Sequence, residues 1–209
     1  IGIALGVGVF TAIRLANTAA MNGFANTKQL LSNEGDYSVV GAGRISEAII
    51  PILNSIACVQ NLRAISSRQA FIFADSEEQG IFEFVGADLF GQTNKAQLQL
   101  LNKDNIFKLL RDNRSVALSA KTIKNLDGRR VFVGRNAERI ELFPVEILES
   151  DLTLSSSTNN IALMDIARFQ ELFQEYGAVD SLSFSLAEKC TPAATIAEVN
   201  RRLPNPYKA

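Results

Sequence analysis

The first 33 residues constrain the fold most, because an uncharged apolar run continues without a break into a helical stripe. The run IGIALGVGVFTAI has one polar side chain, Thr11, and Arg14 ends it. From Ile13 to Leu31, apolar positions recur at three- and four-residue steps, which predicts one face of a helix. A bilayer-spanning helix needs about 20 apolar residues. Two interpretations stay open: a buried helix of a soluble domain, or a truncated membrane span in a chain whose first residue, which is not Met, lies inside a longer gene product.

The composition is that of a globular chain and excludes several classes of function. With 209 residues, 47% of them hydrophobic and 21% charged, the chain is long enough to bury a core as one domain or two small ones. A net charge of −1 argues against a nucleic-acid partner. The absence of His excludes His-assisted Ser or Cys catalysis and most zinc sites.

Two thiols are present, Cys58 and Cys190. A CxxC redox pair and a multi-cysteine metal site are therefore excluded. One disulfide or two buried free thiols both remain compatible with this count. We favour free thiols, because each cysteine lies beside an apolar element and free cysteine is commonly buried.

The segment 36–87 is predicted to be a strand–helix–strand–strand unit. The strands are expected at Tyr37–Val40, Leu62–Ala74 and Ile81–Ala87, and the helix at Ser46–Ala57. Pro51 lies inside this helix, so its first turn is expected to be irregular.

The segment 160–203 is predicted to repeat the strand–helix–strand pattern. Its strands are expected at Ile161–Ile166 and Leu182–Leu186, with an amphipathic helix at Ala167–Tyr176 and a last helix at Ala194–Leu203. The residues between the two units, 88–158, are expected to be mainly β. Two such units predict an α+β fold in which helices cover a mixed sheet.

The inserted segment is expected to contain strands at Ser115–Ser119, Arg130–Val133 and Ile140–Leu148. Pro144 cannot donate a ladder hydrogen bond, so the last of these strands is expected to lie at an edge or to contain a bulge.

Two candidate ligand sites are weak. The turn Gly41-Ala42-Gly43 lies between a strand and a helix, but it lacks the third glycine of a dinucleotide motif and the P-loop Lys-Ser/Thr. The acidic turn with Asp75, Glu77 and Glu78 lacks the alternating oxygen ligands of a calcium loop. We interpret both as ordinary turns.

Two candidate catalytic pairs are equally weak. Ser119 and Lys121 form a single S-x-K, without a sign of a buried lysine or an oxyanion hole. Asp165 and Glu171 flank the predicted helix of the second unit, where capping and surface roles suffice. The sequence thus predicts no catalytic, cofactor-binding or metal-binding residue.

Two clusters are candidate binding surfaces. Alternating aromatic residues on the two adjacent strands of the first unit fit core packing better than an apolar ligand groove; they are Phe71, Phe73, Phe82 and Phe84. The densest basic cluster is interleaved with Glu138 and Glu141 and fits a solvated hairpin face better than a phosphate site; it comprises Arg129, Arg130, Arg135 and Arg139.

Together these segments resemble the extracytoplasmic domain of MacB/FtsX-like ABC transporter permeases. The opening IGIALGVGVFTAIRLANTAAMNGFA looks like the outer end of the first membrane helix of that family. Further similarity lies in GAGRISEAII, in FEFVGADLFG with its hydrophobic strand followed by G-x-D, and in SVALSAKTIKNLDGRRVFV. The segment NIALMDIARFQELFQEYGAVDSLSFSL is similar to the second βαβ unit of the family.

The resemblance implies an organisation in three parts. Residues 1–33 would be the end of the first membrane helix and a stalk, with Arg14 at the interface. Residues 34–87 and 159–209 would form a porter-like α+β layer from two βαβ-type units. Residues 88–158 would be an inserted, mostly β subdomain resembling the sabre of the family. The resemblance thereby favours the membrane-span interpretation of Ile1–Ile13.

The resemblance also implies a function and partners. The chain would be a non-catalytic domain, periplasmic or extracellular, of a bacterial inner-membrane permease that relays ATP-driven motion or handles substrate. Its partners would be a cytoplasmic ATP-binding subunit, a second permease copy and a periplasmic protein, with no cofactor and no nucleic acid. The alternative function is a soluble envelope module that binds an apolar ligand, such as a lipid or peptide, among the phenylalanines.

Overall fold

The computed structural model describes residues 37–89, 108–109, 111–135, 138–147 and 160–209. The predicted helix and stalk of 1–33 lie outside these residues. Within the described ranges, no helix combines the length and apolar character needed to cross a membrane.

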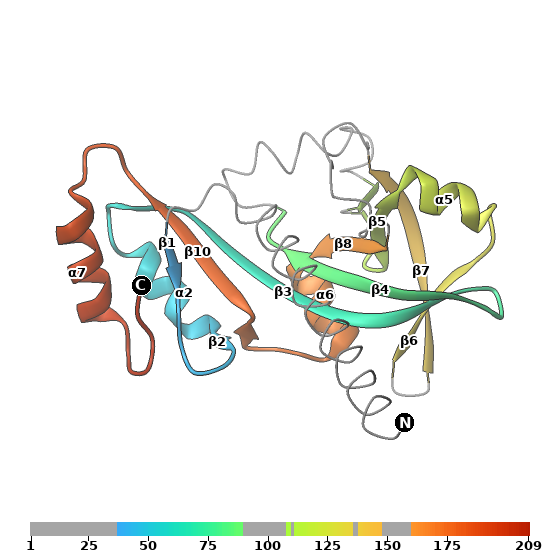
Figure 1. Cartoon of the computed structure of the whole chain (residues 1–209), viewed down its shortest axis with the longest axis horizontal. Coiled ribbons are helices and arrows are strands. Elements are labelled where there is room, and N and C mark those ends of the chain that lie inside the picture. Colours follow the sequence, from blue (N-terminus) through green and yellow to red (C-terminus); the bar gives the residue numbers. More distant parts are fainter. Residues whose placement is uncertain (1–36, 90–107, 110, 136–137, 148–159) are drawn as a thin grey trace, which may run out of the picture.

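The fold is a mixed α/β arrangement in which one large sheet is accompanied by a few helices (Figure 1). The strands are β1 (Tyr37–Val39), β2 (Ile45–Ser46), β3 (Val59–Ala74), β4 (Glu77–Ala87), β5 (Ser115–Ser119), β6 (Val131–Arg135), β7 (Glu138–Ile147), β8 (Ile161–Asp165), β9 (Ala178–Val179) and β10 (Ser181–Leu186). The helices are the 3-10 helix η1 (Glu47–Ile49) and the α-helices α2 (Ile50–Asn54), α5 (Ala120–Leu126), α6 (Ile166–Phe173) and α7 (Pro192–Arg202).

The eight-stranded sheet has the order β1-β10-β3-β4-β8-β5-β7-β6, and a further pairing between β3 and β6 closes six of its strands into a barrel. The closure is short: Ile72, Phe73 and Ala74 of β3 pair with Val133, Phe132 and Val131 of β6. The strands β5, β6 and β7, from the segment 88–158, therefore belong to the same sheet as strands from its flanks. How the chain divides into domains stays a prediction.

The long strand β3 connects the barrel to the rest of the molecule. Its first half pairs with β10, and its second half, from Ile65 onward, pairs with β4. Beyond β10 lies β1, and α2 and α7 lie at the same end of the molecule (Figure 1). We call the part formed by β1, β2, α2, β9, β10, α7 and the first half of β3 the α7 lobe.

Both strand–helix–strand segments join parallel strands that are not neighbours. The strands β1 and β3, connected through α2, are both antiparallel to β10, which lies between them. The strand β8 is parallel to β4, and α6 leads from it across the sheet to β10. This arrangement places α6 against β4, β3 and β8.

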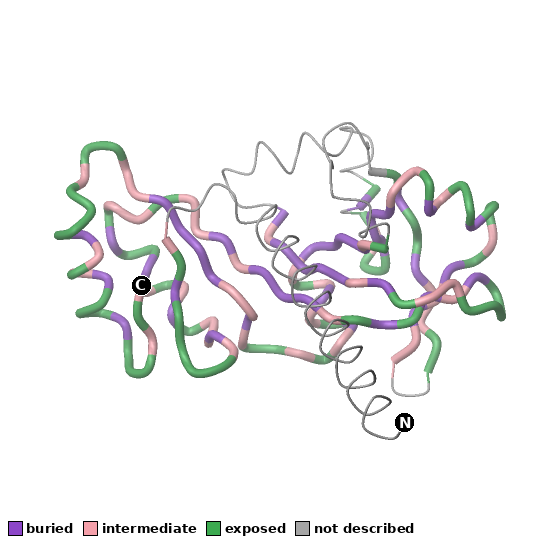
Figure 2. Tube along the Cα trace, viewed as in Figure 1, coloured by how far each residue is buried: buried purple, intermediate pink, exposed green. Residues whose placement is uncertain are grey.

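Buried apolar side chains form three clusters. The first lies on one face of the barrel strands, where Phe82, Phe84 and Ile72 meet Phe169 of α6. The second fills the α7 lobe around Phe184, Leu53 and Val199. The third covers the opposite face of β4, β5 and β8. Figure 2 shows the buried residues continuing along β3 from the lobe into the barrel.

Two local predictions are corrected. The helix expected at Ser46–Ala57 is shorter, a 3-10 turn followed by a five-residue α-helix, and its irregular start is the one predicted from Pro51. An unexpected helix, Ala120–Leu126, follows β5. It begins at a capping serine and ends at Asp127, which adopts left-handed backbone angles (φ 51°).

Among the described strands, Pro144 lies where β7 is paired on one side alone, which agrees with the predicted edge position. The strand β7 pairs with β6 only as far as Leu142, and from Phe143 onward it pairs with β5, where Pro144 is in register with Val116. The pairing between β5 and β7 is parallel.

Candidate functional site

The two residues of the S-x-K pair lie at the start of α5. Ser119 is the N-cap of α5: its Oγ accepts a hydrogen bond from the Thr122 backbone N–H at 3.1 Å and lies 2.9 Å from Thr122 Oγ1. A serine in this position satisfies an otherwise unpaired helix N–H. Lys121 is an exposed residue of the first turn of that helix. The hydroxyl is thus already engaged by Thr122.

Asp165 has the same role at α6. Its Oδ1 accepts from the Ala167 N–H at 3.0 Å, and the residue is buried. Burial raises the pKa of the Asp165 carboxyl, the Ala167 N–H opposes that rise, and the nearby charge of Asp88 adds to it. Glu171, on the same helix, is exposed and lines a pocket described below.

The predicted glycine turn packs against the C-terminal segment. A β-carbon at Gly41 would lie 2.6 Å from Tyr207 Cδ1, and Gly43 has φ +94°. Tyr207 also accepts a hydrogen bond at its hydroxyl from the Ser46 N–H at 3.1 Å. The two glycines therefore permit a tight turn and a close contact with an aromatic ring.

The acidic turn lies between β3 and β4, and its carboxylates face arginines that precede β6. Glu77 Oε2 is 2.7 Å from Arg129 Nη1, and Asp75 Oδ1 is 4.0 Å from Arg130 Nε. Within the described ranges, no group of three or more Cys, Asp or Glu side chains is placed to hold a metal ion. These acids pair with cations of the protein itself.

The four phenylalanines do not line one groove. Phe82 and Phe84 are buried in the barrel core, as the core-packing interpretation predicted. Phe71 is 43% exposed, and Phe73 is half-buried beneath Arg139, whose Cζ lies 4.1 Å from the ring centroid. Because Phe71 and Phe73 alternate with the buried Ile72, they face away from that core. The core prediction is wrong for Phe71.

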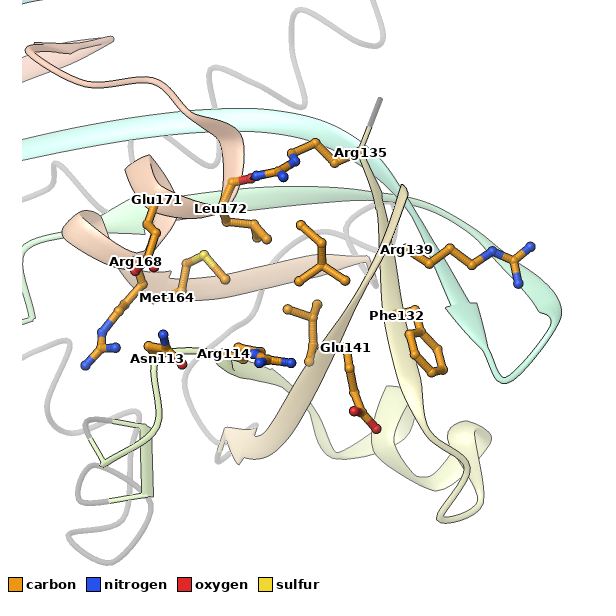
Figure 3. A pocket seen from close by; sticks show the side chains of 12 residues that line it. Asn113, Arg114, Phe132, Arg135, Arg139, Glu141, Met164, Arg168, Glu171 and Leu172 are labelled. Atoms are coloured by element: carbon orange, nitrogen blue, oxygen red, sulfur yellow. The ribbon is translucent and has the colours of Figure 1, made fainter. Parts of the chain in front are cut away.

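The arginine cluster divides into two groups. Arg129 and Arg130 form ion pairs with carboxylates of the acidic turn. Arg135 and Arg139 line a pocket of about 560 Å³ between the β6–β7 hairpin, α6 and the segment before β5, and Arg139 also donates to the Asp75 carbonyl at 3.4 Å. Figure 3 shows Met164 and Leu172 on one side of this pocket and Phe132 on the other.

The pocket has an apolar floor and a charged rim. The floor consists of Ile140, Leu142, Met164 and Leu172. The rim carries the arginines Arg114, Arg135, Arg139 and Arg168 and the glutamates Glu141 and Glu171. The rim charges sum to two positive. Sequence spacing did not group these residues, because Arg114 and Arg168 come from segments 54 positions apart that only the sheet brings together.

A second cluster of charges, which the sequence did not indicate, lies where α7 lobe and barrel meet. Arg44 Nη1 is 2.7 Å from Glu175 Oε2, and Arg44 Nε is 3.0 Å from Asp180 Oδ1. Arg68 Nε also contacts Glu175. We call these four residues the four-charge cluster. All four side chains are no more than 40% exposed.

The four-charge cluster is bonded to the backbone on both sides. Asp180 Oδ2 accepts from the Ser67 N–H of β3 at 2.8 Å, and Arg44 donates to the Ala178 carbonyl of β9 at 2.7 Å. The cluster thus fixes the segment between α6 and β10 against the middle of β3, where pairing changes from β10 to β4.

Cys58 and Cys190 form a disulfide, which corrects the prediction of two free thiols. The bond joins the start of β3 to the loop before α7, across 132 positions of sequence. Pairing between cysteines so distant in sequence depends on β10 returning beside β3, which places Leu186 opposite Val59. The spacing of the two cysteines carries no such information.

No family model matches the chain, and no curated protein matches it in sequence. Solved structures do match in fold. The extracellular domain of the noncanonic ABC-type transporter YknZ from Gram-positive bacteria aligns with a TM-score of 0.58 at 14% identity, covering 82% of this chain and 97% of that domain.

The periplasmic region of MacB from Actinobacillus actinomycetemcomitans is also similar. It aligns with a TM-score of 0.52 at 10% identity, covering 83% of this chain and 86% of that region. Likeness at such identities concerns the fold. The resemblance predicted from the sequence is confirmed at this level: the chain has the mixed α/β fold of extracytoplasmic domains of ABC-type transporters.

Proposed function

We propose that this chain is the extracytoplasmic domain of an ABC transporter permease and that it relays ATP-driven motion from the membrane. The observation that carries the proposal is the match in fold to two such domains over more than four fifths of the chain. The domain performs no catalysis of its own, which accords with the capping roles of Ser119 and Asp165.

The disulfide supports a location outside the cytoplasm. Disulfides persist in oxidising compartments such as the periplasm and the cell surface, and cytosolic proteins mostly keep their thiols reduced. The bond between Cys58 and Cys190 is half-buried in the α7 lobe, where it holds the beginning of β3. We place the domain in the periplasm or outside the cell, attached to the bacterial inner membrane.

The connection between lobe and barrel supports a mechanical role. One continuous strand, β3, belongs to both, and the four-charge cluster fixes a second segment against its middle. Two bodies joined at such a junction move together rather than independently, since bending there would separate ion pairs and ladder hydrogen bonds. A displacement applied to one body would therefore reach the other.

The segment that applies the displacement is residues 1–33. In this proposal Ile1–Ile13 lie in the membrane, Arg14 lies at the interface and Ala16–Leu31 form the stalk. The porter-like layer comprises 34–87 and 159–209, and 88–158 is the inserted subdomain. Partners are a cytoplasmic ATP-binding subunit, a second permease copy and a periplasmic protein.

The test uses the full-length permease with its ATP-binding subunit in right-side-out membrane vesicles. A cysteine introduced as Asn125→Cys on the exposed side of α5 is labelled with a membrane-impermeant maleimide. The labelling rate is compared with ATP inside the vesicles and after trapping with vanadate. A relay predicts a nucleotide-dependent rate, and Ala20→Pro in the stalk removes the dependence, because proline interrupts a helix.

Two controls make the result decisive. ATP hydrolysis by the Ala20→Pro protein should persist, and the melting curve of its domain should be unchanged. Nucleotide-dependent labelling that survives Ala20→Pro contradicts the relay through the stalk. An open reading frame that ends soon after residue 209, without further apolar spans, contradicts the permease assignment itself.

A further inference from the structure

We propose that the pocket between α6 and the β6–β7 hairpin binds an amphiphilic anion, a molecule with a phosphate or carboxylate group beside a short apolar chain. The inference depends on the side chains that line the pocket and not on the transport function proposed above. The volume of the pocket, about 560 Å³, falls within the range of ligand clefts, roughly 300–1,000 Å³.

The floor of the pocket is apolar and would contact the apolar chain of the ligand. Leu142, Met164 and Leu172 belong to the barrel core and are less than 10% exposed, yet they border the pocket. Atoms of the core are thus within reach of a molecule that enters from solvent. Burial of an alkyl chain against them is favourable by about 25 cal/mol per Å² of apolar surface.

Two guanidinium groups are placed to bind the anionic group of the ligand. Figure 3 shows Arg135 and Arg114 on opposite sides of the pocket, reached from β6 and from the segment before β5. Arg135 is held in place because Nη1 donates to the Leu172 carbonyl at 2.7 Å, and Nη2 is 3.3 Å from the exposed Glu138. A guanidinium fixed in this way keeps donors for a planar anion and loses little entropy on binding one.

Arg114 has hydrogen-bond donors that none of the described residues uses. Within the part of the chain that the structure describes, its guanidinium makes no hydrogen bond and no ion pair. Its backbone is nevertheless fixed: its N–H donates to Asp112 Oδ1 at 3.0 Å, and its carbonyl accepts from the Phe143 N–H at 2.9 Å. The unused donors of Arg114 therefore have a defined place at the edge of the floor.

A matched arginine on the same rim serves as a control. Arg139 also lines the pocket, but Figure 3 shows its guanidinium directed away from Arg114, and it stacks on the Phe73 ring at 4.1 Å. Arg139 contributes long-range charge without a donor to the floor. Changing Arg139 therefore separates general attraction of anions from binding at Arg114.

The experiment is isothermal titration calorimetry on the 209-residue chain with three probes. Each probe is used below its critical micelle concentration. Octyl phosphate carries both features, octyl glucoside carries the chain without the charge, and inorganic phosphate carries the charge without the chain. We expect octyl phosphate to bind at least about tenfold more tightly than either other probe. We expect Arg114→Gln to weaken that binding about tenfold, which corresponds to about 1.4 kcal/mol.

Arg139→Gln should change the affinity for octyl phosphate less than about twofold, which corresponds to about 0.4 kcal/mol. Both substituted residues are exposed, and unchanged far-ultraviolet circular dichroism verifies that each variant is folded. Equal binding of octyl phosphate and octyl glucoside overturns the anionic part of the proposal. Equal binding of octyl phosphate and inorganic phosphate overturns the apolar part, and equal losses in the two variants overturn the location.

Discussion

A β-carbon at Gly86 would lie 2.5 Å from the β-carbon of Phe169, closer than side-chain atoms approach in folded proteins. Gly86 is in β4, in register with Met164 of the parallel strand β8. The helix α6 can lie directly on β4 because position 86 has no side chain. The pocket depends on this contact, since Leu172 of the same helix lines it.

The first prediction concerns this contact. Gly86→Ala should lower the free energy of unfolding by about 1–3 kcal/mol, because the helix or the strand must shift to admit a methyl group. Urea denaturation followed by circular dichroism measures it. Gly134→Ala is the matched control in a strand: its β-carbon would come closest to Phe73 Cε2, on the outer edge of a ring, at 3.1 Å. If both variants lose the same free energy of unfolding, the close approach of α6 to β4 does not determine the cost of Gly86→Ala.

The second prediction concerns the four-charge cluster. Asp180→Ala should destabilise the domain by about 2–3 kcal/mol, because it removes a charged acceptor from the Ser67 N–H and leaves the Arg44 guanidinium short of a partner. Thermal melts and urea titrations measure the loss.

The control for Asp180→Ala is Glu198→Ala, which removes ion pairs with Arg201 and Arg202 on the solvent side of α7. Its cost should be the smaller of the two, since exposed ion pairs within one helix are screened by solvent. If Asp180→Ala costs no more than Glu198→Ala, the cluster does not fix the junction.

The third prediction concerns the disulfide. Folded protein prepared without reductant should contain no thiol that reacts with Ellman's reagent, even in urea, and two thiols after reduction. Replacement of both cysteines by serine should lower the stability by about 2–5 kcal/mol, because the unfolded chain loses a long covalent loop. Two reactive thiols in unreduced, unfolded protein would contradict the bond between Cys58 and Cys190.

The fourth prediction concerns the pH dependence caused by Asp165. Its pKa in the folded chain is raised above the ordinary value of 3.8, chiefly by burial. The folded state therefore holds the proton more tightly, and between pH 3.8 and the raised pKa the stability falls as pH rises. Asparagine can still accept the Ala167 hydrogen bond but has no charge to bury.

The free energy of unfolding of the Asp165→Asn variant, relative to that of the wild-type chain, should consequently be higher at pH 7 than at pH 4. The comparison needs the difference in unfolding free energy between the two proteins at each pH. A difference that stays constant, or that moves in the opposite direction, would mean that burial does not disfavour the charged form of Asp165.

The local sequence pattern predicted where the strands lie in the chain, but it did not predict which strands pair with one another. The strands expected at Ile161–Ile166, Leu182–Leu186 and Arg130–Val133 overlap β8, β10 and β6, because strand signals depend on residues close in sequence. Nothing local indicates that β10 pairs between β1 and β3, or that β6 closes onto β3. Such pairings are decided by the packing of whole strands.

The residues that form the pocket could not be predicted from the sequence. The sequence analysis interpreted Ser119 as a residue without a catalytic partner, and in the structure Ser119 caps α5. The pocket and the four-charge cluster escaped detection because their members come from distant segments. Arg44 meets Glu175 only after α6 has crossed the sheet. The residues next to Arg44 in the sequence do not indicate which acid it will contact.

The central claim is that the domain stands on the outer side of a membrane as part of a longer permease. Its most direct test is maleimide labelling of the full-length protein carrying Asn125→Cys, in spheroplasts with an intact membrane. Asn125 is exposed on α5, and Cys58 and Cys190 are protected by their bond. Labelling by a membrane-impermeant maleimide before lysis is the predicted result; labelling only after lysis would contradict the claim.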